Sequence, residues 1–116
     1  FGNRFITVFL WSAVGARPLM LNQPCRVIRC GSGTDDEAIT AAGTPALLRG
    51  FAANETAGAT AQFVIRDGVD NTGAIIMTVN LAASESAREY FPFAIEVDTA
   101  LWLERVTGNI DVNVFV

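Results

Sequence analysis

Residues 60–82, with the sequence TAQFVIRDGVDNTGAIIMTVNLA, carry the pattern from which the fold can be predicted. This stretch holds two apolar runs, at 63–65 and 75–79, separated by a polar break at 67–73. Both runs are rich in β-branched residues, and the Gly, Asp and Asn residues of the break favour a turn. The pattern therefore predicts a β-hairpin.

Short apolar runs separated by turn residues continue on both sides of this hairpin. Gly50 lies inside one of the runs and indicates a bulge or a close approach of two backbones. Pro92 is expected to interrupt regular pairing in another, because proline has no N–H to donate. The expected strands outside the hairpin are 25–30, 37–42, 46–54, 87–91, 93–97, 100–107 and 110–116.

The last two strands are expected to form a second hairpin. Gly108 and Asn109 between them make a two-residue turn signal. In the final strand apolar and polar side chains alternate, which indicates one buried and one solvent-facing side. The residues expected to point inward there are Ile110, Val112, Val114 and Val116.

This series of short runs predicts an all-β protein. About seven to nine short antiparallel strands, with turns between them and no convincing helix, are typical of a β-sandwich or a jelly roll. We expect a single sandwich domain over residues 25–116, preceded by an extended N-terminal arm at 1–24.

The segment at 1–24 contains the run FITVFLWSAV at 5–14. As a strand it would carry apolar side chains on both faces, which favours a strand or arm held in an interface with a neighbouring subunit. The alternative is a secretory signal, because Arg4, a short apolar core and the small residues Gly15 and Ala16 have that outline. The run is too short to span a bilayer, so no membrane association is expected.

Composition narrows the function classes. The net charge is −4, which argues against binding to nucleic acid. The chain has no His, so the usual general base and the commonest transition-metal ligand are both missing. Hydrophobic residues make up 51% of the chain and the mean hydropathy is +0.36, which indicates apolar surface buried against another chain. We therefore expect an oligomer or a subunit docked on another chain.

No residue pattern points to catalysis, a cofactor or a metal. The acids at 35–37 lack the ligand spacing of a calcium loop, so 31–36 is expected as a solvated acidic loop. The carboxylates of the last third show no spacing that selects a glycosidase pair. Cys25 and Cys30 are five residues apart and would point to opposite faces of one strand, which predicts two free, buried thiols. The chain is expected not to be an enzyme.

Aromatic residues supply the candidate contact surface. Tyr90, Phe91, Phe93 and Trp102 would suit a sugar-stacking platform, but packing in the core or an interface is the favoured interpretation. Trp102 has the opposite parity from its neighbours Leu101 and Leu103, which suggests an outward apolar face used in a subunit contact. The expected interface residues are Phe5, Phe9, Trp11, Arg17, Tyr90, Phe91 and Trp102.

From Leu48 onward, short segments and turns follow one another in a fixed order along the chain. These are Gly50-Phe51 leading to Asn54, the run 61–68, the turn 84–86, Glu89-Tyr90-Phe91-Pro92, Ile95, the run 99–103 and Val106-Thr107-Gly108. This order resembles that of the decoration or cement proteins of tailed-phage capsids and related β-sandwich head proteins.

This resemblance implies a mechanical function. The chain would bind the major capsid protein and copies of itself on the outer surface of the virion, after assembly in the host cytoplasm. As a homo-oligomer, a trimer or a dimer, it would stabilise the shell. The alternative function is a carbohydrate-binding or adhesin-type β-sandwich module, from a phage fibre or a secreted bacterial protein.

Overall fold

The structure is a computed structural model that describes residues 25–116. The expected N-terminal arm and the expected interface residues Phe5, Phe9, Trp11 and Arg17 lie outside the described residues. The described part is all-β and contains eight strands and no helix. The strands are β1 (Val27–Gly33), β2 (Glu37–Ala38), β3 (Ala46–Glu55), β4 (Ala61–Asp67), β5 (Ala74–Leu81), β6 (Ser86–Val97), β7 (Leu101–Thr107) and β8 (Ile110–Phe115).

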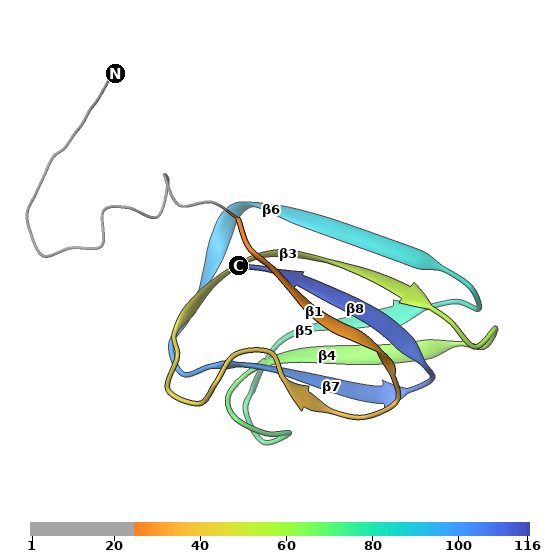
Figure 1. Ribbon diagram of the computed structural model, residues 1–116, viewed down its shortest axis with the longest axis horizontal. Helices are drawn as coiled ribbons and strands as arrows, with labels where there is room; N and C mark the ends of the chain where they lie inside the picture. Colours follow the sequence, from red (N-terminus) through yellow and green to blue (C-terminus); the bar gives the residue numbers. More distant parts are fainter. Residues whose placement is uncertain (1–24) are drawn as a thin grey trace, which may run out of the picture.

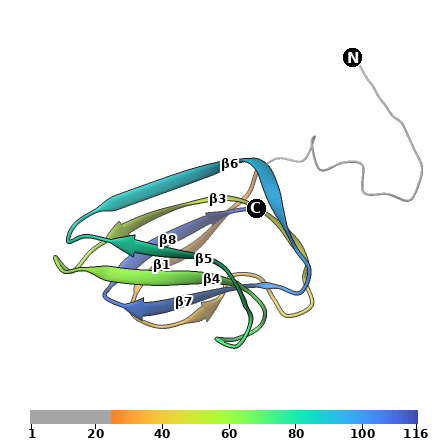
Figure 2. The same ribbon diagram turned by 180° about the vertical axis from the view of Figure 1, so that it is seen from behind.

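The strands pair in a nested order. β4 pairs with β5, β3 with β6, β2 with β7 and β1 with β8, all antiparallel. Two further pairings, β3 with β8 and β4 with β7, join these pairs into two four-stranded sheets. We call β1-β8-β3-β6 sheet A and β2-β7-β4-β5 sheet B (Figure 1; Figure 2 shows them from behind). This order is that of a jelly roll, so the predicted sandwich fold is confirmed.

The core lies between the two sheets and is built from the inward side of each strand. Phe63 and Ile65 of β4 are fully buried, and the ring of Phe63 meets that of Phe51 edge-on at 5.6 Å. The period-2 pattern of β8 is confirmed, because every second residue of that strand points into this core. The fully buried large side chains are Leu48, Phe63, Ile65, Val97, Leu101, Leu103, Ile110, Val112 and Val114.

The predicted hairpin at 60–82 is confirmed as β4 and β5, but the second hairpin is wrong. β7 lies in sheet B and β8 in sheet A, so Gly108 and Asn109 carry the chain from one sheet to the other. The apolar rows of β7 and β8 therefore face each other across the core. A two-residue connection between two half-buried strands fits either arrangement, and the pairing of β7 with β4 decides between them.

Three other boundaries differ from the sequence prediction. β6 is one continuous strand, because the residues around Pro92 form a bulge in which β6 has three more residues than β3 between Leu48 and Gly50. β1 continues through Gly33 instead of ending in a loop, with a register shift at Gly31. β2 is only two residues long, because it pairs with β7 only opposite Trp102 and Leu103.

The charged side chain of Arg105 is buried at the edge of the core. The Arg105 guanidinium on β7 forms an ion pair with Glu37 at 2.8 Å, and its side chain is 1% exposed. It also donates to the backbone carbonyls of Ile110, Asp35, Cys30 and Gly31. Arg105 therefore joins sheet B to strands β1 and β8 of sheet A and to the loop before β2. Asp35 and Asp36 are exposed, as expected for a solvated acidic loop, but the Asp35 carbonyl and the Glu37 carboxylate also bind Arg105.

Candidate functional site

An apolar row crosses the outer face of sheet A. The pairing register places Val27 of β1 opposite Phe115 of β8, Phe115 opposite Gly50 of β3, and Gly50 opposite Tyr90 of β6. The rings of Tyr90 and Phe115 stack at 5.3 Å with an angle of 8° between their planes. We call Val27, Phe115 and Tyr90 the aromatic strip. It brings together side chains from three separate strands.

Gly50 lies on β3 opposite both Tyr90 of β6 and Phe115 of β8. A Cβ added there would clash with the carbonyl oxygen of Glu89, so glycine allows the backbones of β3 and β6 to approach closely at this point. The expected close approach of backbones at Gly50 is thus confirmed, whereas its link to an aromatic pair was not expected.

The bulge in β6 exposes a further aromatic residue. Phe93 is 87% exposed, and Tyr90, three residues earlier on the same strand, is 63% exposed. Phe91, which was expected in an interface, is half-buried and packs against the core. Phe91 and Phe93 are two residues apart and would share one face of a regular strand, but in the bulge Phe91 is half-buried and Phe93 is exposed. Monomeric proteins seldom leave aromatic side chains this exposed in one region without a partner.

Cationic residues lie beside the aromatic strip. The next row across the outer face of sheet A pairs Arg29 with Asn113, Asn113 with Ala52, and Ala52 with Arg88. Arg29 and Arg88 are both exposed. An apolar row flanked by arginines has the composition of many protein–protein interfaces, in which aromatic residues and Arg are enriched.

Trp102 lies on the opposite side of the molecule. It is on β7 in sheet B, half-buried, and its indole N–H donates to the side-chain oxygen of Asn71 at 2.6 Å. Beside it, Arg66 forms an ion pair with Glu104 at 2.9 Å. The outward position of Trp102 is confirmed. Tyr90 and Trp102 belong to different sheets, however, so the aromatic residues do not form the single sugar-stacking platform that was considered.

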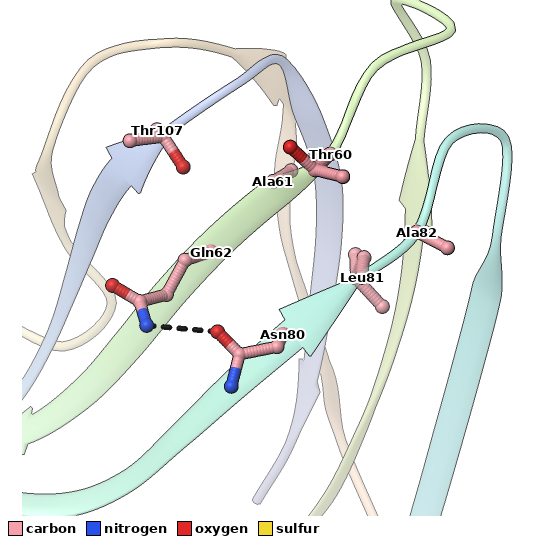
Figure 3. Close-up of a pocket in the computed structure, with 7 residues that line it drawn as sticks. All are labelled: Thr60, Ala61, Gln62, Asn80, Leu81, Ala82 and Thr107. Atoms are coloured by element: carbon pink, nitrogen blue, oxygen red, sulfur yellow. Dashed lines mark hydrogen bonds between the residues drawn. The ribbon is translucent and has the colours of Figure 1, made fainter.

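The outer face of sheet B carries a shallow hollow of about 410 Å³ (Figure 3). Gln62 on β4 lies opposite Thr107 on β7 and Asn80 on β5. The side-chain amide of Gln62 donates to that of Asn80 at 2.8 Å. The hollow is lined by Thr60, Ala61, Gln62, Asn80, Leu81, Ala82 and Thr107, and none of these residues is charged.

Glu55 and Cys30 have shifted pKa values, and the cause in each case is structural. The Glu55 carboxylate accepts backbone N–H groups from Ser84, Ala57 and Gly58, and these bonds hold its pKa below the usual range. Burial raises the pKa of the Cys30 thiol to about 11, which makes it a poor nucleophile. Both cysteines are free, as predicted, but Cys25 is exposed and not buried as expected.

Two features are absent from residues 25–116. No three His, Cys, Asp or Glu side chains come together in an arrangement that suits a metal ion. This part of the chain also has no helix that is long and apolar enough to cross a membrane.

Comparisons with known proteins give no relative. No protein-family model, curated protein or solved structure matches this chain.

Proposed function

We propose that this chain is a virion structural protein, a decoration or cement subunit that binds the major capsid protein and stabilises the shell from outside. The proposal depends on the exposed aromatic residues of β6 in sheet A: Tyr90 is 63% exposed and Phe93 is 87% exposed. The jelly-roll strand order adds support by analogy, since capsid domains are among the proteins built on this fold.

The proposed contact between this chain and the capsid protein is strong enough to stabilise the shell when many copies bind together. Burying a Phe side chain that is otherwise exposed contributes about 1.5–3 kcal/mol. Phe93 and Tyr90 would insert into the capsid surface, while Arg29 and Arg88 at the side would pair with acidic groups of the shell. A modest contact of this kind, repeated over a symmetric shell, stabilises the whole assembly through multivalency.

Mass spectrometry of purified particles, from the phage or prophage whose genome encodes the chain, tests this function first. The expected result is a fixed ratio of this chain to the major capsid protein. Its absence from such particles would overturn the proposal.

A binding experiment then tests the surface itself. Recombinant chain is added to shells stripped of it, and the Phe93→Ala variant is compared with Val106→Ala, which shortens an exposed residue of the other sheet. Losing the burial of Phe93 should weaken binding about ten- to a hundredfold, while Val106→Ala should bind like the parent. Equal binding by all three proteins would contradict the assignment of this surface.

The hollow on sheet B favours a second candidate, a carbohydrate-binding module. Amide and hydroxyl groups from Gln62, Asn80 and Thr107 give it neutral donors and acceptors of the kind that bind sugar hydroxyls. A glycan array probed with the parent and with Gln62→Ala distinguishes this function. Binding that the variant loses would favour it, and an array without binding would exclude it for the glycans displayed.

A further inference from the structure

β5 differs from the other three edge strands of the sandwich. Each sheet ends in two strands with one unpaired side, namely β1 and β6 in sheet A, and β2 and β5 in sheet B. An unpaired edge offers backbone N–H and C=O groups to any other strand, so proteins protect such edges with charges, prolines, bulges or short strands.

Three of the edges carry these protections. β2 has only two residues. β1 contains Arg29 and a register shift at Gly31. β6 contains Pro92 within a three-residue bulge, together with the charged residues Arg88, Glu89 and Glu96.

β5 has almost none of them. Its sequence, AIIMTVNL, contains no charged residue and no proline, and the whole of 71–84 is uncharged. Its one irregularity is a single extra residue next to Met77, so the five residues from Met77 to Leu81 pair regularly with β4. This regular stretch is rich in strand-forming residues and leaves one side free for pairing.

The core is also incompletely covered beneath this edge. Phe63 and Ile65 on β4 are 0% exposed, whereas their partners Val79 and Met77 on β5 are only half-buried. A strand added beside β5 would cover these apolar side chains as well as the backbone groups.

We infer that β5 pairs with β5 of a second copy of this chain, antiparallel about a two-fold axis at Val79. The stretch Met77-Thr78-Val79-Asn80-Leu81 alternates apolar and polar residues symmetrically about its centre. Pairing about that centre places Val79 opposite Val79, Met77 opposite Leu81 and Thr78 opposite Asn80 of the second copy. Apolar side chains thus meet on the inner face, and polar side chains meet on the outer face.

Two features support a second copy as the occupant. A two-fold axis brings like residues together, and an uncharged strand allows this without electrostatic repulsion. On the outer face, the hydrogen-bonded amides of Gln62 and Asn80 would continue to Thr78 of the second copy, extending the polar row seen in Figure 3. The result is one continuous eight-stranded sheet across the dimer, in which both β5 edges are covered.

The pairing area is small, so the dimer should be concentration-dependent. Pairing of one short strand buries less surface than a standard interface, and we expect a dissociation constant of about 1–100 µM. Sedimentation equilibrium of the full chain from about 1 µM to 1 mM, the range around that value, measures it directly. Hydrogen exchange of the same samples should show β5 amides becoming protected as the dimer forms. A chain that remains monomeric throughout would overturn the inference.

A matched pair of variants locates the interface. Thr78→Lys puts a charge on the exposed outer side of the β5 edge. Thr107→Lys makes the same change at an exposed residue of β7, which β4 separates from the β5 edge. Edge lysines oppose strand pairing, so Thr78→Lys should weaken dimerisation about tenfold or more, while Thr107→Lys leaves it unchanged. Equal effects of the two variants would contradict the inference. So would β5 amides already protected in the monomer, since another segment, such as residues 1–24, would then cover the edge.

The inference is independent of capsid binding. Phe93→Ala alters the surface proposed to bind the shell and should leave the dimer intact, whereas Thr78→Lys should disrupt the dimer of purified protein in the absence of shells. A chain that dimerises but is absent from virions would refute the proposed function alone.

Discussion

Replacing Arg105 by methionine would remove the hydrogen bonds that connect the two sheets at one end of the sandwich. Methionine matches the unbranched part of the arginine side chain that precedes the guanidinium group and has no hydrogen-bond donor, so the change removes the guanidinium. Its N–H groups bond the Ile110 carbonyl at 3.1 Å, the Asp35 carbonyl at 2.7 Å and the Gly31 carbonyl at 2.6 Å. They also bond the Glu37 carboxylate, which would lose its partner.

The expected fall in the free energy of unfolding depends on how well water can replace the guanidinium at each of its partners. Breaking a buried ion pair by removing one member costs about 3–5 kcal/mol. The Glu37 side chain is 39% exposed, so water can solvate it in the variant. The carbonyls of Gly31 and Asp35 belong to exposed residues and can also be hydrated, while that of Ile110 lies in the core. We therefore expect the free energy of unfolding to fall by about 2–4 kcal/mol.

Urea unfolding followed by tryptophan fluorescence measures this change. With a denaturant slope of about 1–3 kcal/mol per molar, the midpoint should fall by about 1–3 M. Arg88→Met on exposed β6 is the matched control and should change the free energy by less than about 0.5 kcal/mol. Arg105→Lys keeps the charge but lacks the planar fork, so it should recover only part of the loss. The reasoning is refuted if Arg105→Met is no more destabilising than Arg88→Met.

The remaining predictions concern a carboxylate, a glycine and two thiols. The pKa of Glu55 is held below its ordinary value of 4.5 in the folded state, so its contribution to stability is present above that pH and is lost as the pH falls through the folded-state pKa. Glu55→Gln should therefore lower the melting temperature near neutral pH and flatten its fall in acid; melting curves parallel to those of the parent at every pH would contradict this. Gly50→Ala should destabilise the fold by about 1–3 kcal/mol or more, because the new methyl group meets the Glu89 carbonyl oxygen. An unchanged melting temperature would show that the backbones can separate at little cost. Iodoacetamide should label exposed Cys25 well before Cys30, whose pKa is about 11, as peptide mass spectrometry can measure. Equal labelling rates would mean that the Cys30 thiol is not buried in solution.

Local pattern was sufficient to predict most of the strands. The segments at 46–55, 61–67, 74–81 and 110–115 each alternate or carry β-branched residues, and these features depend only on neighbours in sequence. The close approach of two backbones at Gly50 was also predictable, since an isolated glycine inside a strand pattern indicates it. The continuous course of β6 was not, because a bulge can absorb Pro92 at an edge strand without ending it.

The candidate surface was predictable only in part. Tyr90 and Trp102 were expected to face outward, and both do so. Phe115, Val27 and Gly50 gave no local sign that they would join Tyr90, because their neighbourhood arises from the register of four strands. Phe93 was expected to pack in the core or in an interface. Its exposure excludes the core position, and the bulge in β6 could not be predicted from the local pattern.

By itself, the sequence determined that this chain would form short antiparallel strands with one apolar side, because alternation and turn chemistry act over a few residues. The tertiary structure decided which strands became neighbours. β7 and β8 show the difference: either strand could pair with the other or face it across the core, and only the packing of all eight strands selects one arrangement. The same packing buries Arg105 and leaves β5 with an open edge, since both outcomes depend on partners distant in the chain.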